Sequence, residues 1–198
     1  MPTGTEYLYP DSTVSNTDWS VTADTVHERL TSTSTSSNPA TTGVLLDADG
    51  GVFVVTLGDF TEPVNFQRID SVQLEMNYYM ETKGVTNSVT AVIEEASLGS
   101  DYYSEGTGTL SYLDAYQLFN FTTRPTFDGS NPWTTARVND VRLEITGNTN
   151  GGQLFINYLR LAVNYTTIIP TYDNSKPNLG ISSGSLNVKN GTLVVSGV

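Results

Sequence analysis

A strict alternation of apolar and polar residues constrains the fold of this chain more than any other feature of its sequence. Between Ser71 and Glu81 the alternation runs almost unbroken, and its apolar positions are Val72, Leu74, Met76, Tyr78 and Met80. Successive side chains of a β-strand point to opposite faces of a sheet. The segment therefore predicts a strand with one buried face and one solvated face.

A second segment, from Val141 to Thr146, repeats the alternation, with Val141, Leu143 and Ile145 on one side. Less regular β-rich runs lie at 7–9, 19–22, 44–46, 52–57, 88–94, 116–122 and 153–165. Clusters of Gly, Asp and Asn separate these runs and are typical of turns. About eight or nine strands at this spacing predict an all-β antiparallel β-sandwich of jelly-roll type. Only two segments indicate helix: 22–30, with one or two turns, and 134–140, with one turn.

Changes in composition divide the chain into four parts. Residues 1–42 are expected to form an N-terminal extension and a Ser/Thr-rich loop, of which only the first strand, at about 19–22, joins the sandwich. The predicted core of the sandwich is 43–166. A proline-containing linker is expected at 167–180, and a C-terminal hairpin arm at 181–198.

The C-terminal arm carries a strong hairpin signal. Asn190-Gly191 favours a tight type I′ turn. Apolar residues flank this turn at alternate positions, and they are Leu186, Val188, Leu193 and Val195. An isolated two-stranded hairpin is marginally stable in water, so these residues need another surface to cover them. They are the candidate interface residues, and two alternatives stay open: the arm docks on a neighbouring subunit or partner protein, or it folds back on its own sandwich.

The charge of the chain excludes several classes of partner. With 21 acidic and 9 basic residues the formal net charge is -12, which repels phosphate backbones and anionic lipid headgroups. Nucleic acid and membranes are therefore not expected as partners. The chain has no cysteine and a single histidine, His27, so disulfides, thiolate zinc sites and multi-histidine metal sites are excluded. No cofactor is predicted.

The motif Asp47-Ala48-Asp49-Gly50-Gly51 has the opening of a calcium-binding loop. The ligands that should follow are missing, since 52–54 is strand-like and Gly58 occupies the twelfth position, where a glutamate is needed. The motif is therefore interpreted as a hairpin turn, with calcium at Asp47 and Asp49 as the less favoured alternative. No metal site is predicted.

The sequence also offers no good pair of carboxylates for the active site of a glycosidase. Glu94 and Glu95 are adjacent on a predicted strand and so point to opposite faces, where they cannot act on one sugar. A lone histidine such as His27 is more often a surface or capping residue than a catalytic base. The chain is predicted not to be an enzyme.

Aromatic residues offer a possible binding function, because tyrosine and tryptophan rings stack on sugars. The residues considered for glycan stacking are Tyr102, Tyr103 and Trp133, which are expected in or near loops. In the favoured interpretation Trp133 instead plugs one end of the sandwich beneath a proline-anchored turn. The tyrosines then lie at subunit contacts, where aromatic residues are enriched.

Several segments together resemble a known group of proteins. They are Ser20-Val21-Thr22 leading into the segment that ends at Leu30, the alternating Val72–Met76 strand, Pro132–Ala136, Val138–Leu143 and the last strand Tyr158–Tyr165. This combination, over about residues 19–166, is similar to the jelly-roll β-sandwich proteins of tailed bacteriophages. The resemblance implies a virion surface component of the head decoration, capsid fibre or tail accessory type, and it brings no catalytic motif.

The sequence thus predicts a structural virion protein that decorates or reinforces the particle. Its expected partners are other virion proteins of the capsid or tail, together with further copies of itself in a homo-oligomer. Its expected location is the virion, assembled in the host cytoplasm, where a protein without disulfides is stable. The alternative is a carbohydrate-binding module of a phage tail or fibre, or of a bacterial surface protein.

Overall fold

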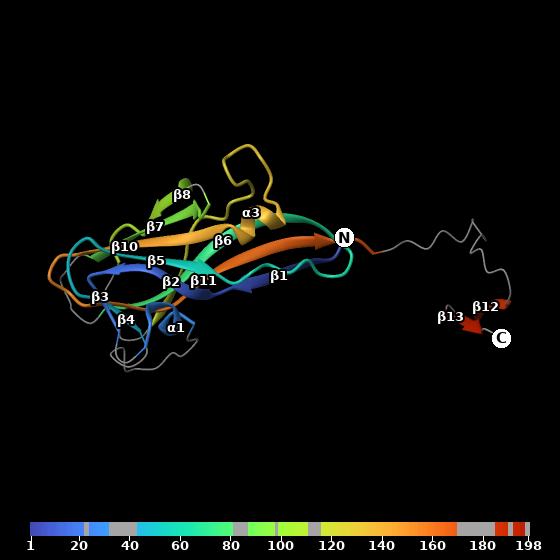
Figure 1. Cartoon of the computed structure of the whole chain (residues 1–198), viewed down its shortest axis with the longest axis horizontal. Coiled ribbons are helices and arrows are strands. Elements are labelled where there is room, and N and C mark those ends of the chain that lie inside the picture. Colours follow the sequence, from blue (N-terminus) through green and yellow to red (C-terminus); the bar gives the residue numbers. More distant parts are fainter. Residues whose placement is uncertain are drawn as a thin grey trace.

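The structure is a computed structural model that describes residues 1–21, 24–31, 43–80, 87–97, 99–110, 116–169, 185–189 and 192–196. Two antiparallel sheets pack face to face, which confirms the predicted all-β jelly-roll sandwich (Figure 1). Sheet A contains, in order, β3 (Trp19–Ser20), β4 (Val44–Leu46), β11 (Leu154–Thr167), β6 (Phe66–Met80) and β9 (Gln117–Asn120), with β1 (Thr3–Leu8) also paired to β11. Sheet B contains, in order, β2 (Pro10–Thr17), β5 (Gly51–Leu57), β10 (Val141–Thr149), β7 (Asn87–Glu95) and β8 (Ser100–Gly106).

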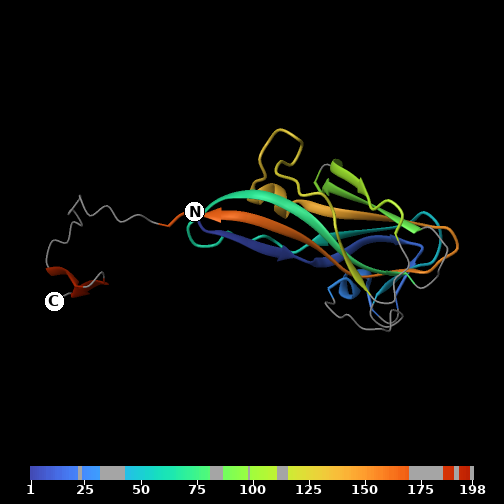
Figure 2. The ribbon, with the colours of Figure 1, turned by 180° about the vertical axis from the view of Figure 1, so that it is seen from behind.

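The long strands β6 and β11 form the centre of sheet A and run side by side (Figure 2). The opposite edge of β11 is shared by several partners in turn. It pairs with β4 at Phe155 and Ile156, with Thr31 at Tyr158, and with β1 from Leu161 onward. The first and last strands of the sandwich therefore lie next to each other.

The N-terminal segment is part of the sandwich and not an extension from it. β1 pairs with β11 in sheet A, and β2 pairs with β5 in sheet B through two register shifts. The β-rich run at 7–9 predicted the end of β1 but not its place in the sandwich. Nothing predicted β2, because its sequence is polar apart from Pro10 and Val14, and most of its residues are exposed on the edge of the sheet.

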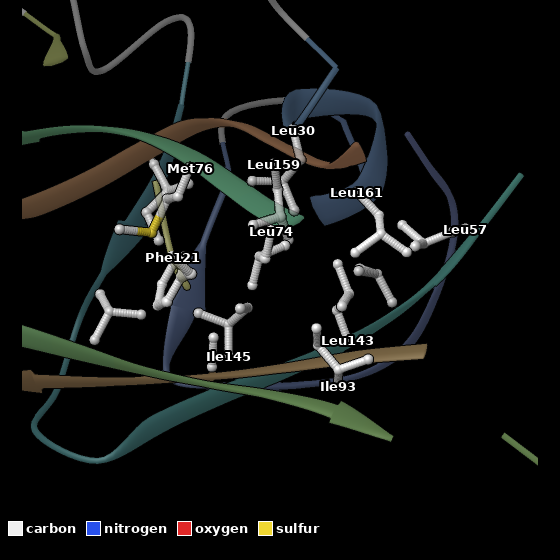
Figure 3. Packing of buried hydrophobic residues seen from close by; sticks show 14 of the residues in the cluster. Leu30, Leu57, Leu74, Met76, Ile93, Phe121, Leu143, Ile145, Leu159 and Leu161 are labelled. Carbon is white, nitrogen blue, oxygen red and sulfur yellow. The ribbon is translucent and has the colours of Figure 1, made fainter. Parts of the chain in front are cut away.

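The core fills the space between the sheets, with side chains from both sheets meeting in one layer (Figure 3). All five apolar positions of the 71–81 alternation are buried, and so are the three of the 141–146 alternation. These patterns were read correctly because each strand has one face on the core, so burial follows the period of two. Leu143, Leu159 and Leu161 have no exposed surface at all.

The two short helices lie where they were predicted but are shorter. α1 covers Val26–Arg29 and begins at a capping box made by Thr25 and Glu28. α3 covers Thr135–Asn139, and the Thr134 hydroxyl caps it by accepting the Arg137 N–H. None of the helices in the described part of the chain is long and apolar enough to cross a membrane.

The C-terminal arm contains the predicted antiparallel pair of strands. β12 (Ser185–Lys189) pairs with β13 (Thr192–Ser196), and Lys189 opposite Thr192 closes the ladder around a two-residue connection. The type of the turn at 190–191, the linker over 170–184 and the Ser/Thr-rich loop at 32–42 lie outside the described residues.

Candidate functional site

Strands β7 and β10 run the length of sheet B and define two different ends of the sandwich. Glu95 of β7 lies opposite Val141 of β10 at one end, which we call the aromatic end. Asn87 lies opposite Thr149 at the other, which we call the polar end. The residues singled out in the sequence fall on both ends.

Trp133 fills the aromatic end. Its side chain is only 3% exposed, and its indole N–H donates a hydrogen bond to the Arg124 carbonyl at 3.1 Å. The rings of Tyr102 and Phe127 contact it edge-on, with ring centroids 5.6 and 6.2 Å away. Edge-to-face packing of this kind is favourable for aromatic rings in a core. Trp133 therefore lies inside the sandwich, in the position that the plug interpretation requires.

Tyr102 and Tyr103 lie in strand β8, not in a loop. The Tyr103 hydroxyl donates to the Thr126 carbonyl at 2.5 Å and accepts the Gly129 N–H at 3.1 Å, while the Arg124 guanidinium lies 4.2 Å above its ring. β8 escaped prediction because its sequence, Ser-Asp-Tyr-Tyr-Ser-Glu-Gly, has no apolar alternation.

Tyr102 packs on the other side of the same cluster. Its ring meets Phe127 edge-on at 5.4 Å as well as Trp133. Burial raises the pKa of Tyr102 to about 12, and the neighbouring Glu95 carboxylate adds to the effect. The structure thus packs Tyr102 and Trp133 into one cluster with Phe127, and it ties Tyr103 to Thr126, Gly129 and Arg124. These rings are used in packing and do not form an exposed platform for a sugar.

A hollow of about 550 Å³ opens beside this cluster, lined by Glu95, Ser97, Thr134, Ala136, Arg137, Asn139 and Asp140. Several of its polar groups have partners within the chain. The Ser97 hydroxyl donates to Asp140 at 2.6 Å, and the Asn139 amide binds the backbone N–H and carbonyl of Phe60. Arg137 lies 3.3 Å above the Phe127 ring. These contacts hold α3 and its flanking residues against the sandwich, so the hollow is a structural feature.

The carboxylates considered for catalysis do not converge. Glu94 is buried and accepts a hydrogen bond from Arg142 Nε at 2.5 Å, whereas Glu95 lies beside the Tyr102 hydroxyl. His27 contacts the hydroxyls of Thr13 and Thr25 at 3.0 and 2.9 Å, beside the first turn of α1. In the part of the chain that the structure describes, no three acidic, histidine or cysteine residues gather as a metal site would require.

The Asp47–Gly51 motif forms the turn between β4 and β5, at the polar end. Asp47 accepts the Ser20 hydroxyl at 2.9 Å, while Asp49 accepts the Thr149 backbone N–H at 2.9 Å. The two carboxylates therefore serve different neighbours. Gly50 has a φ of 77°, a left-handed conformation that favours glycine and explains its place in the turn. The motif is therefore a turn, but the predicted hairpin is wrong, because β4 pairs within sheet A and β5 within sheet B.

A second hollow, of about 280 Å³, lies at the polar end. Its lining residues all have polar side chains and are Asp49, Asn87, Ser88, Thr109, Asn148, Thr149 and Asn150. Asn87 is only 1% exposed, and its Oδ1 accepts the Asn150 N–H at 3.3 Å. Its Nδ2 is buried and has no hydrogen-bond partner in the described structure.

The sequence predicted few of the residues that line this second hollow. Of its lining residues, only Asp49 was considered in advance, as a calcium ligand. Asn87, Ser88 and Thr109 were not singled out, because they come from other connections and only the folded sheets bring them to the same end. The one available signal was the concentration of Asn, Ser and Thr next to predicted strand ends.

Comparison with known proteins gives no family. No family model matches the chain, and no curated protein does. Among solved structures, the C-terminal CBM6 of LamC, a marine laminarinase from Zobellia galactanivorans, is 12% identical with a TM-score of 0.41, covering 80% of this chain and 98% of that one. TmCBM27, a carbohydrate-binding module with specific mannan recognition, is 9% identical with a TM-score of 0.41, covering 84% and 100%.

A viral protein is also among the matches. The structure of infectious bursal disease virus, Gx strain, is 13% identical with a TM-score of 0.34, covering 85% of this chain and 37% of that one. All three TM-scores are low, so no function is carried over from these proteins. The resemblance to phage virion proteins stays a prediction.

Proposed function

We propose that this chain is a non-catalytic structural protein of a tailed-bacteriophage virion, and that it decorates or reinforces the particle through protein–protein contacts. The observation that carries the proposal is the C-terminal hairpin of β12 and β13, two strands of five residues each that follow the sandwich in the chain. It acts as an arm that binds other virion proteins or a second copy of the chain.

The pairing of β12 and β13 supports a binding role. The register sets position 186 opposite 195 and position 188 opposite 193. Positions two apart on a strand share a face, so the four apolar residues Leu186, Val188, Leu193 and Val195 belong to one face of the hairpin. Two strands alone bury too little apolar surface to be stable in water, and a contiguous apolar face is a common mark of an interaction site.

The body of the molecule is suited to a structural role. Three carboxylates that point away from solvent are each neutralised by an arginine of the same chain: Glu75 by Arg160, Glu94 by Arg142 and Glu105 by Arg124. The aromatic residues considered for glycan stacking are used in packing. The net charge of -12 keeps many copies soluble at high local density.

The test compares the full chain with a chain ending at residue 169, which retains every strand of the sandwich. We expect both to give the same circular dichroism spectrum, because the deleted strands belong to neither sheet A nor sheet B. Two measurements then compare the chains. In light scattering, only the full chain should form an assembly. Alternatively, when phage particles are produced with the protein supplied from a complementing plasmid, only the full chain should be incorporated.

Two matched double variants locate the binding face. The Leu186→Ser, Val195→Ser pair changes one register pair on the apolar face, and the Asn187→Ser, Val194→Ser pair changes the next register pair on the other face. We expect the first to reduce assembly or incorporation to the level of the truncated chain and the second to leave it near that of the parent. Normal assembly and normal incorporation of the truncated chain would overturn the proposal.

A further inference from the structure

Exposed apolar side chains gather at one end of the sandwich, where sheet A extends past α3 (Figures 1 and 2). Seven large apolar side chains of the described residues are exposed, and four of them belong to this end: Met1, Val64, Ile168 and Ile169. Val64 is 86% exposed and Ile169 69%. We call these four residues the apolar tip. Single apolar residues scattered over a surface are normal, whereas a cluster marks an interaction site.

Three segments that are distant in sequence meet at the apolar tip, and backbone hydrogen bonds join them. The Thr167 N–H donates to the Pro2 carbonyl at 2.9 Å, and the Ile168 N–H donates to the Asn65 carbonyl at 2.8 Å. Each of the two acceptors directly follows a residue of the apolar tip in the chain. The tip residues are therefore neighbours around the end of β11.

The loop that carries Val64 is fixed from the inside by an aromatic cluster. Phe60 is buried and packs against Phe66 and Tyr165, with ring centroids 5.7 Å away in both cases. Its backbone N–H donates to the Asn139 side chain at 2.8 Å, which also ties the loop to α3. A packed loop thus holds Val64 at the surface, and the exposure of this side chain is a property of the fold.

We infer that the apolar tip is the docking surface for the C-terminal hairpin of a second copy of the chain. The inference rests on the proposed function, in which the arm binds outside its own chain. The hairpin of β12 and β13 has one apolar face, and contact between this face and the apolar tip removes both surfaces from water.

Charge favours the arm as the occupant over another sandwich. Residues 1–169 contain 20 acidic and 7 basic residues, a net charge of -13, whereas residues 170–198 contain two lysines and one aspartate, a net charge of +1. The loop that carries Val64 exposes Asp59 and Glu62, while the hairpin sequence contains Lys189 and no acidic residue. Two sandwiches repel each other, but the arm is attracted to the acidic surroundings of the tip.

The point at which the arm leaves the sandwich sets the size of the assembly. The arm follows Ile169, which is itself part of the apolar tip, and 15 residues separate it from Ser185 at the start of β12. A segment of this length spans at most about 50 Å. An arm that crosses to a second copy therefore keeps the two tips close together, and the second arm docks in return at a high effective concentration. We expect a two-fold symmetric dimer with exchanged arms.

Cross-linking tests the contact directly, because the chain has no cysteine of its own. A Val64→Cys chain and a size-tagged Val188→Cys chain are mixed and treated with a short bis-maleimide, and the heterodimer is measured on a denaturing gel. The matched control replaces Val64→Cys by Val14→Cys, at an exposed position on β2. We expect at least about tenfold more heterodimer from the first mixture, because docking raises the effective concentration of the two thiols.

Complementation of two defective full-length chains separates docking between copies from docking within one chain. The tip variant Val64→Ser, Ile169→Ser keeps an intact arm, and the arm variant Leu186→Ser, Val195→Ser keeps an intact tip. In analytical ultracentrifugation each variant alone should dimerise at least about tenfold more weakly than the parent, and their mixture should form a 1:1 complex.

The Val14→Ser, Leu118→Ser chain is the matched control for the tip variant, since it also replaces two exposed apolar residues, on β2 and β9. It should dimerise like the parent. All substituted side chains of the sandwich are exposed, so circular dichroism should show the parent's fold in each variant.

Four outcomes would overturn the inference: a full chain that stays monomeric, a folded tip variant that dimerises like the parent, two defective chains that form no complex, or a cross-link that forms only within one chain carrying both cysteines. The proposed function has a separate readout in phage particles. If the arm variant is not incorporated while the tip variant is incorporated normally, the arm binds another virion protein, and the inference fails while the proposed function stands.

Discussion

The sandwich is closed in different ways at the two ends of β7 and β10. At the aromatic end, Trp133 and its neighbours close the sandwich with rings, beside a hollow of about 550 Å³ in which the Ser97 hydroxyl donates to Asp140. At the polar end the hollow is about half that size, yet the Asn87 amide at its floor is unpaired. The comparison shows that ring packing closes the aromatic end, whereas hydrogen bonds between turns close the polar end.

The largest effect is expected at the aromatic end. Trp133→Ala should lower the free energy of unfolding by about 3–5 kcal/mol, because it removes a buried ring and leaves a cavity. Chemical denaturation followed by far-ultraviolet circular dichroism measures this loss. The conservative control is Leu118→Ala, since Leu118 is 47% exposed and should change stability by less than about 0.5 kcal/mol. A stability loss for Trp133→Ala as small as the control's would show that the ring does not plug the end.

A moderate effect is expected from Tyr103→Phe. The change removes one hydroxyl that joins β8 to the Thr126 carbonyl and the Gly129 N–H. The lost hydrogen bonds and the orphaned carbonyl should cost about 1–3 kcal/mol. Tyr7→Phe, at a position 41% exposed on β1, is the matched control and should be nearly neutral. Equal denaturation midpoints for the two variants would contradict the structural role of Tyr103.

A substitution at the polar end should change the stability of the fold much less. Asn87→Leu removes a donor that is already unpaired, and this offsets the loss of its bond with the Asn150 N–H, which can reach water instead. The free energy of unfolding should therefore stay within about 1 kcal/mol of the parent. A loss of several kcal/mol would mean that Asn87 is a structural residue, and the contrast between the two ends would disappear.

The smallest effect is on the pH dependence of stability, through the carboxylate of Asp128. The backbone N–H and side-chain amide of Asn131, followed by the Ser130 N–H, lower the pKa of Asp128 in the loop before Trp133. A carboxylate with a depressed folded pKa stabilises the fold at pH values above its unfolded pKa, about 3.9, and this contribution is lost as the pH falls through the folded value. Asp128→Asn should thus be slightly less stable than the parent at neutral pH, with the difference shrinking below about pH 4.

Thermal denaturation of both chains across this range measures the difference. Asn131→Ala, which removes one of the donors but leaves the carboxylate, should show the same trend with a smaller amplitude. A difference between parent and Asp128→Asn that is constant with pH would indicate that the loop depends on shape and not on the charge of Asp128.

Local patterns predicted the strands that place one apolar face on the core, and they failed for edge strands with polar sequences. The strands around Leu74 and Leu143 were found because their alternation faces a core. β2 and β8 were missed because edge strands with polar sequences carry no such alternation. Their place depends on pairing with β5 and β7, which are distant in sequence.

The candidate site was less predictable than the fold. Asp49 attracted notice for a motif, but its structural partner is the Thr149 N–H, 100 positions away. Tyr102, Tyr103 and Trp133 were recognised as a group, although their exposure could not be inferred from sequence. The sequence identifies residue types. Whether a particular amide finds a hydrogen-bond partner depends on which turns meet at one end of a sheet.

The pairing of β1 with β11 bears on how the molecule is made. The Thr167 hydroxyl contacts the Pro2 carbonyl, 165 positions away, and the backbones of the two residues are also hydrogen-bonded. A ribosome must therefore synthesise almost the whole sandwich before its first strand finds a neighbour. Until then the edge of β1 and one edge of β6 are exposed to pairing with other nascent chains. Folding should be slow and largely post-translational, because the closing contacts join the two extremes of the sequence.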